Sequence, residues 1–118
     1  MKDRERTFVL VTCSGISSTG KLTARVAAVL LAKYPDLFEA HYPVAGLKRT
    51  PDRELREADG IVVIDGCSDS CALKKISGWG LCPDHHCVAT DHGIEKKGMD
   101  DPGFHEIELL ARVIVGRV

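Results

Sequence analysis

Two apolar segments, residues 7–12 and 60–65, constrain the fold of this chain more than any other feature. They read Thr-Phe-Val-Leu-Val-Thr and Gly-Ile-Val-Val-Ile-Asp. A strand with one face in water alternates apolar with polar residues, and neither segment does so. The pattern indicates strands covered on both faces, which is typical of a parallel sheet. A helical pattern over residues 20–33, with apolar residues at three- and four-residue spacing, lies between the two segments.

The rest of the chain continues this alternation of strands and helices. We predict further strands over residues 37–41 and 85–90, and helices over 51–58, 69–77 and from the Asp101-Pro102 step onward. Such an order argues for parallel strands joined by helical crossovers. Because 118 residues is an ordinary size for one domain, we expect residues 1–118 to form a single-domain, three-layer α/β sandwich. Its sheet is expected to be mainly parallel, Rossmann-like or flavodoxin-like.

Charge and hydropathy exclude several classes of partner. The chain has 16 Lys and Arg against 17 Asp and Glu, a formal net charge of -1, so no strong positive field attracts phosphate backbones. No apolar stretch approaches the roughly 20 residues that a membrane span needs. We therefore expect a cytoplasmic protein that binds neither nucleic acid nor membrane. The sequence does not indicate a protein partner, and it leaves self-association open.

Five cysteines are the main sign of chemistry. In a reducing compartment an odd number of thiols is poorly explained by disulfides, and metal ligation or thiol chemistry becomes the better interpretation. Cys13 directly follows the first predicted strand, His41 ends the second and Cys67 follows the third. Ligands collect at the carboxyl ends of strands in an open parallel sheet, so these residues should share one edge.

Cys71 completes the predicted site. It lies four positions after Cys67, and a helix starting between them would bring its side chain back over the turn. The positive end of that helix favours thiolates. Cys13, His41, Cys67 and Cys71 supply three sulfur atoms and one imidazole, one of the usual tetrahedral Zn²⁺ sets. We expect a closed or nearly closed zinc site.

The fourth ligand stays open among His41, Cys82, Cys87 and His92. Cys82 and Cys87 could also pair with Cys67 and Cys71 in a zinc ribbon, although Cys87 falls inside a predicted strand. His92 follows that strand and could approach the same sheet edge. If Cys87 is a core thiol, its neighbours Cys82, His85 and His86 are expected in loops or at the surface.

Three motifs together resemble the DGC-domain family of zinc-binding proteins. They are Cys13-Ser-Gly15 after the first strand, Asp65-Gly-Cys67 with Cys71-Ala72, and Thr90-Asp-His-Gly-Ile94 followed by Lys96 and Lys97. The match extends from Val9 to Lys97. In that family a cysteine commonly precedes a Leu-Pro-like step where this chain has His41-Tyr-Pro43. The resemblance implies metal binding and no particular reaction.

Three other classes use a loop after a first strand. Gly15–Lys21 resembles a phosphate-binding P-loop, but Leu22 stands where a Mg²⁺-binding hydroxyl belongs. Cys13–Thr19 resembles the phosphocysteine loop of sugar phosphotransferase B subunits, which would bind an anion with backbone amides. A low-molecular-weight phosphatase would need an arginine at position 19, which is threonine. The alternative to zinc is therefore a thiol enzyme or phosphocysteine carrier that uses Cys13, and the sequence assigns no reaction.

Overall fold

A computed structural model describes residues 7–15, 17–44 and 53–118. The elements in chain order are β1 (Phe8–Thr12), α1 (Ser18–Lys33), β2 (Phe38–Pro43), α2 (Arg53–Arg56), β3 (Gly60–Asp65), α3 (Cys71–Gly78), β4 (His85–Val88), the short 3₁₀ helix η2 (Ala89–His92) and α4 (Phe104–Arg117). Strands and helices alternate, as predicted. The predicted cap and first turn of the helix over 51–58, Thr50 and Pro51, lie outside the described residues.

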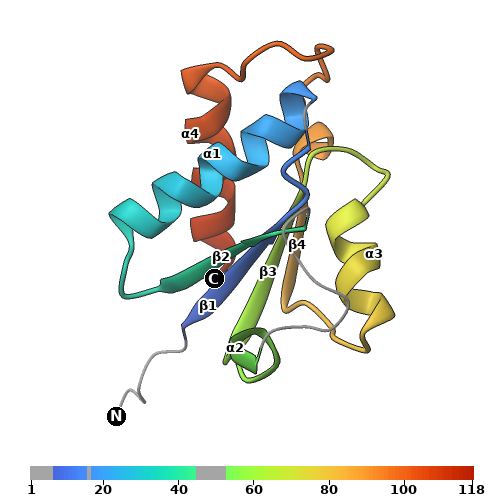
Figure 1. Cartoon of the computed structure of the whole chain (residues 1–118). Coiled ribbons are helices and arrows are strands. Elements are labelled where there is room, and N and C mark those ends of the chain that lie inside the picture. The colour runs from blue at the N-terminus through green and yellow to red at the C-terminus, as the bar shows by residue number, and fades with distance from the viewer. Residues whose placement is uncertain (1–6, 16, 45–52) are drawn as a thin grey trace.

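The described strands form one parallel sheet in the order β2-β1-β3-β4. β1 and β3 are neighbours at its centre, and their registers place Val11 beside Val63 and Thr12 beside Ile64. Both strands therefore end at the same edge. α1 and α4 cover one face of the sheet and α3 covers the other (Figure 1). The three-layer α/β sandwich with a parallel sheet is confirmed.

Burial on both faces explains why β1 and β3 do not alternate in polarity. Phe8 and Leu10 of β1 pack under α1 and α4, whereas Val9 and Val11 pack on the side of α3. All five residues of β1 and all six of β3 are buried. Removal of apolar area from water on both faces stabilises the sheet at about 25 cal/mol per Å². The central strands thus form a rigid support for the turns that follow them.

The N-terminus of α1 lies two residues earlier than the sequence pattern indicates. Ser17 caps the helix, and its Oγ accepts a hydrogen bond from the Gly20 amide at 3.1 Å. Ser18 and Thr19 are therefore helical and buried. This capping satisfies an amide that has no partner within the helix, which is why serine is common at this position.

Several further predicted boundaries are wrong by a few residues. β2 ends at Pro43 rather than at His41. α3 begins at Cys71 rather than at Asp69, because Ser70 has a left-handed backbone with φ of 51°. β4 ends at Val88, where the chain turns into η2. The last helix begins at Phe104 rather than at the Asp101-Pro102 step, and the side chain of Phe104 is 69% exposed.

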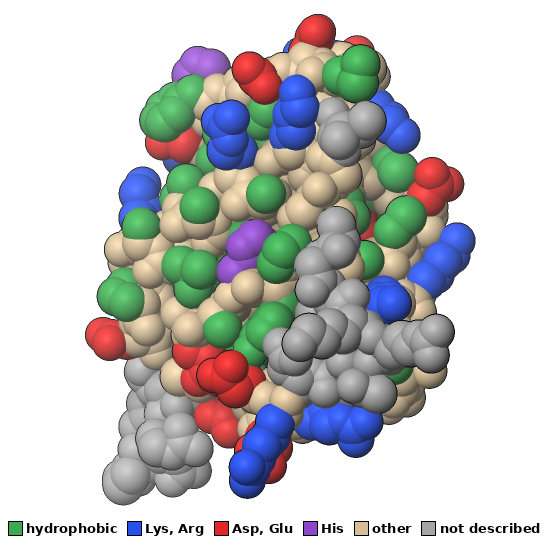
Figure 2. Space-filling model, viewed as in Figure 1, with side chains coloured by type: hydrophobic (Ala, Val, Ile, Leu, Met, Phe, Trp, Pro, Cys, Tyr) green, Lys and Arg blue, Asp and Glu red, His purple; other side chains and the backbone are tan. Residues whose placement is uncertain are grey.

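The face that carries α1 and β2 is shown in Figure 2. Hydrophobic side chains and one histidine occupy its centre, and acidic and basic side chains lie mainly around its rim. No helix among the described residues has the length and hydrophobicity needed to cross a membrane.

Candidate functional site at the carboxyl edge of the sheet

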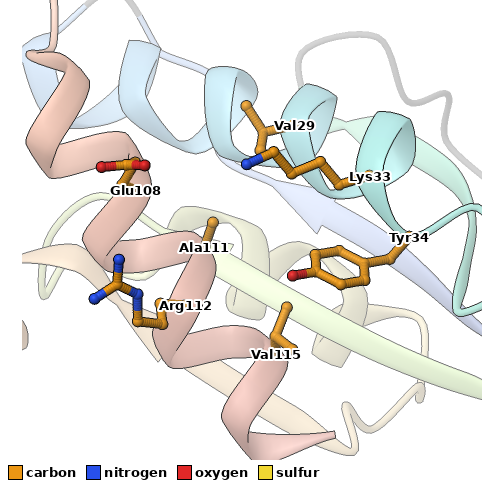
Figure 3. A pocket seen from close by; sticks show the side chains of 7 residues that line it. All are labelled: Val29, Lys33, Tyr34, Glu108, Ala111, Arg112 and Val115. Atoms are coloured by element: carbon orange, nitrogen blue, oxygen red, sulfur yellow. The ribbon is translucent and has the colours of Figure 1, made fainter.

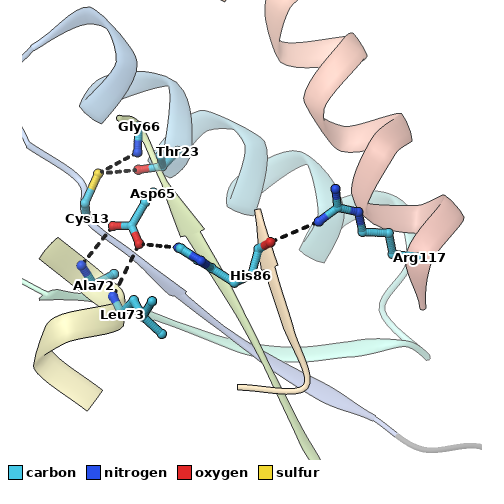
Figure 4. A network of polar contacts seen from close by, with 8 residues as sticks. All are labelled: Cys13, Thr23, Asp65, Gly66, Ala72, Leu73, His86 and Arg117. Atoms are coloured by element: carbon cyan, nitrogen blue, oxygen red, sulfur yellow. Dashed lines mark hydrogen bonds and ion pairs between the residues drawn. The ribbon is translucent and has the colours of Figure 1, made fainter. Parts of the chain in front are cut away.

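The turns after β1 and β3 meet at the carboxyl edge of the sheet. The Gly66 amide donates a hydrogen bond to the Cys13 sulfur at 3.3 Å (Figure 4). Cys67 is the next residue after Gly66, so the sequence prediction that residues 13 and 67 approach each other at one edge agrees with this contact. Cys13 and Cys67 are both half-buried and both free thiols.

Thr23 of α1 is the second polar neighbour of Cys13. Its hydroxyl oxygen lies 3.7 Å from the Cys13 sulfur and accepts a hydrogen bond from the Ser14 amide at 3.0 Å. The same hydroxyl donates to the Gly20 carbonyl at 2.8 Å. Because a threonine hydroxyl carries one proton, Thr23 can act only as an acceptor toward the sulfur in this arrangement. The Cys13 thiol therefore has one donor, Gly66, and one acceptor.

Gly66 is required by the close packing of this turn on α1. A Cβ added at Gly66 would lie 2.7 Å from the Thr19 carbonyl carbon and 2.8 Å from the Thr19 carbonyl oxygen. No side chain fits at such distances without a shift of backbone. The absence of a Cβ thus lets the Asp65-Gly66-Cys67 turn sit directly on the first turn of α1 and reach Cys13.

Asp65 connects the end of β3 to α3. Its carboxylate is buried and accepts hydrogen bonds from the Ala72 amide at 2.8 Å and the Leu73 amide at 3.3 Å. These are free amides of the first turn of α3, so Asp65 caps that helix from a distance of seven residues. Cys71, the first residue of α3, is thereby held next to the turn that carries Cys67, although it is exposed.

His41 lies in β2 on the same side of the sheet as Leu10 and Thr12, and it is engaged by Thr12. The two atoms Nε2 of His41 and Oγ1 of Thr12 are 2.7 Å apart, and Thr12 also bonds the Ser14 hydroxyl. Burial lowers the pKa of His41 from its usual 6.5, which favours a neutral imidazole. A neutral ring is the form that binds a metal, but here its Nε2 faces a hydroxyl.

The other candidates for the fourth position lie at three different places. Cys87 is buried in β4 and paired with Ile64, and burial raises the pKa of its thiol, opposed by Arg117 and reinforced by Asp91. Cys82 is exposed in the connection before β4, where Asp84 bonds Ile61 at the start of β3. Cys82 therefore lies toward the amino edge of the sheet. His92 ends η2, just beyond the carboxyl end of β4.

No three histidine, cysteine, aspartate or glutamate side chains within residues 7–15, 17–44 and 53–118 are arranged to hold a metal ion. The chemistry of the predicted donors nevertheless fits zinc, because three thiols and a neutral imidazole are ligands that Zn²⁺ prefers. In the structure, the Cys13 sulfur and the His41 imidazole are both in contact with protein groups, and the turn that leads to Cys67 lies against Cys13.

Among the described residues at the N-terminus of α1, Ser18 and Lys21 are bound by protein groups and are not left open to a phosphate. The Ser18 amide donates to the Gly98 carbonyl at 2.8 Å, and the Ser18 hydroxyl accepts from the Lys97 amide at 2.6 Å. The Lys21 ammonium bonds the Met99 carbonyl at 2.6 Å. The segment 97–99 thus takes the groups with which a P-loop binds phosphate.

A surface groove lies between α1 and α4 (Figure 3). Its volume is about 220 Å³, and Val29, Tyr34, Glu108 and Arg112 are among the residues that line it. None of the predicted zinc ligands lines this groove.

Comparison with protein families settles the membership of the chain. The family model described as DGC domain matches residues 9–114. The chain belongs to the DGC domain family. This DGC domain includes Cys13, His41, Cys67 and Cys71, and the resemblance inferred from the sequence motifs is confirmed. No curated protein and no solved structure matches the chain.

Sequence reasoning missed the role of His86. His85 and His86 lie in β4, inside the strand predicted over residues 85–90. Both are half-buried, whereas we expected them in a loop or at the surface if Cys87 is a core thiol. The Nε2 of His86 bonds the Asp65 carboxylate at 2.8 Å. The signal that could have indicated this contact is a carboxylate at the end of a strand that reads as buried, because a buried carboxylate needs hydrogen-bond donors.

Proposed function

We propose that this DGC domain binds a zinc ion at the carboxyl edge of its sheet, with the sulfur atoms of Cys13, Cys67 and Cys71 as ligands. The observation that carries the proposal is the 3.3 Å hydrogen bond from the Gly66 amide to the Cys13 sulfur. This hydrogen bond connects Gly66, the residue before Cys67, to Cys13. An amide that donates to sulfur also stabilises a thiolate, the form that binds metal.

Cys71 supports the same proposal through its place on α3. Cys71 begins the first turn of this helix, directly after residues 67–70. Asp65 fixes that turn through the Ala72 and Leu73 amides. Zinc binding would draw the Cys67–Ser70 turn and the exposed Cys71 side chain toward Cys13, a rearrangement of side chains and one short turn.

We propose His41 as the fourth ligand. A neutral imidazole carries one proton, and an Nε2–H that donates to Thr12 leaves Nδ1 with the lone pair. Metal-binding histidines commonly donate their other ring nitrogen in this way. Four protein ligands would give a closed, structural site without an open position for water.

Metal analysis of purified protein tests the proposal. Wild type produced without added zinc should contain stoichiometric zinc, and Cys13→Ser, Cys67→Ser and Cys71→Ser should each lose most of it. Cys82→Ser is the matched control, because Cys82 is exposed toward the opposite edge of the sheet, and it should retain the metal. Cobalt substitution should give sulfur-to-metal charge-transfer absorption that weakens in the same three variants.

Two results would contradict the proposal. One is a wild type that takes up no zinc at micromolar concentration while it remains folded. The other is equal metal content in the wild type and all serine variants. If, in addition, only Cys13→Ser abolished covalent labelling or phosphate transfer, the thiol-enzyme or phosphocysteine alternative would explain the Gly66–Cys13 contact instead.

A further inference from the structure

A chain of hydrogen bonds through the buried Asp65 carboxylate extends from the start of α3 to the edge strand β4. Asp65 lies between the two ends: it accepts from the Ala72 and Leu73 amides through Oδ1 and Oδ2, and from His86 through Oδ2. The carboxylate side chain is 1% exposed, and His86 is 24% exposed. In Figure 4 the imidazole of His86 points along the sheet at the carboxylate, on the side opposite the α3 amides.

The burial of Asp65 makes each of these donors important. A carboxylate removed from water costs several kcal/mol unless hydrogen bonds replace its hydration. Ala72 and Leu73 provide two donors from one side, and His86 is the donor from β4. An ionised carboxylate only accepts, so the His86 Nε2 carries the proton in this contact. Without the His86 donor, Oδ2 of Asp65 would keep only the longer hydrogen bond, 3.3 Å, from the Leu73 amide.

The backbone of His86 is itself held in place. Arg117, near the end of α4, donates to the His86 carbonyl at 2.9 Å. β4 pairs with β3 through His86 and Val63. The imidazole therefore projects from a strand that is fixed on two sides, which limits its freedom to leave the carboxylate.

From this geometry we propose that His86 is a positioning residue for the thiol edge: through Asp65 it fixes the first turn of α3 and, with it, the place of Cys71. Where it concerns zinc affinity, the proposal rests on the proposed function. Its structural part, the coupling of His86 to the α3 amides, stands independently of any metal. His86 itself is not assigned as a ligand.

The test compares His86→Leu, which removes the donor, with His86→Gln, which keeps an N–H donor on a side chain of similar reach. His85→Leu is the matched control, since His85 is the preceding strand residue and its ring packs against Phe8 at 5.9 Å. Amide hydrogen exchange of the metal-free protein is measured for Ala72 and Leu73. Zinc affinity is measured by competition with a chelator.

In His86→Leu, the Ala72 and Leu73 amides should exchange about tenfold faster, because the cap that protects them is weakened. The amides of α1 should keep their wild-type rates, which separates a local effect from general destabilisation. Zinc affinity should fall about tenfold, the usual effect of losing a group that supports a ligand. His86→Gln should restore both quantities, and His85→Leu should change neither.

Wild-type exchange at Ala72 and Leu73 in His86→Leu would overturn the proposal, as would equal acceleration of the α1 amides. Faster exchange with unchanged zinc affinity would show that His86 supports only the helix and not the metal ligand. If wild type binds no zinc, the proposed function fails, and the exchange rates alone then decide whether His86 positions the turn.

Discussion

Substitution of Gly66 by alanine tests the packing on which the candidate site depends. The new Cβ would meet the Thr19 carbonyl carbon at 2.7 Å and its oxygen at 2.8 Å. Both atoms belong to the backbone of α1, so the clash cannot be relieved by a side-chain rotation. Forcing one extra carbon into a packed interior costs about 1–3 kcal/mol. For a domain of this size 1 kcal/mol corresponds to about 4 °C, so the melting temperature should fall by about 4–12 °C.

Thermal and urea unfolding followed by circular dichroism measure this loss. Gly78→Ala is the matched control, because Gly78 is the last residue of α3 and a Cβ there meets nothing within 4 Å. It should leave stability unchanged or raise it by up to about 1 kcal/mol, since alanine is the better helix former. If Gly66→Ala melts together with wild type, the turn does not rest on α1 as described, and the approach of residues 13 and 67 loses its basis.

Three further predictions concern thiols, pH and the core. In the metal-free protein, exposed Cys71 and Cys82 should react first with a maleimide, and Cys87 should react only on unfolding because burial covers it and raises its pKa. Early labelling of Cys87, detected by peptide mass spectrometry, would contradict the β4 packing. Burial lowers the pKa of His41, so the imidazole binds a proton more tightly in the unfolded chain than in the folded one. The free energy of unfolding should therefore fall as pH drops below 6.5. Urea titrations should show a smaller fall for His41→Gln. Leu30→Ala should lower the free energy of unfolding in urea by about 2–5 kcal/mol, because Leu30 is fully buried. Leu109→Ala should have a small effect, because Leu109 is 43% exposed. Equal losses of stability in the two variants would refute the assigned core.

The sheet could be predicted from the sequence because its signal is local. Continuous apolar runs at 7–12 and 60–65 reflect burial on both faces, and parallel pairing then places their carboxyl ends together. The helix starts were less accurate. The capping of α1 by Ser17 is a local contact, but α3 is capped by Asp65, seven residues before the first amide it bonds. A sequence pattern cannot show such a cap until the turn between is known.

Side-chain directions at the candidate site could not be predicted in the same way. His41 was predicted at the end of its strand, but β2 continues to Pro43 and His41 pairs with Leu10 in the middle of β1. That its Nε2 faces Thr12 depends on this pairing. The contact of His86 with Asp65 needs β4 to lie beside β3 in the observed register. The segment 97–99 covers the start of α1 from almost 80 residues away, a separation at which no periodicity carries information.

The contacts of Cys13 divide into those that a metal would keep and those that it would break. A sulfur bound to zinc still accepts hydrogen bonds, so the Gly66 amide can remain on Cys13. The Thr23 oxygen faces the sulfur as an acceptor because its proton is on the Gly20 carbonyl. Loss of the thiol proton to a metal would remove any S–H donation to Thr23, and the Thr23 hydroxyl could donate to the sulfur only by turning away from the Gly20 carbonyl. The proposed metal binding at Cys13 would then be coupled to the first turns of α1, the same turns that Gly66 contacts.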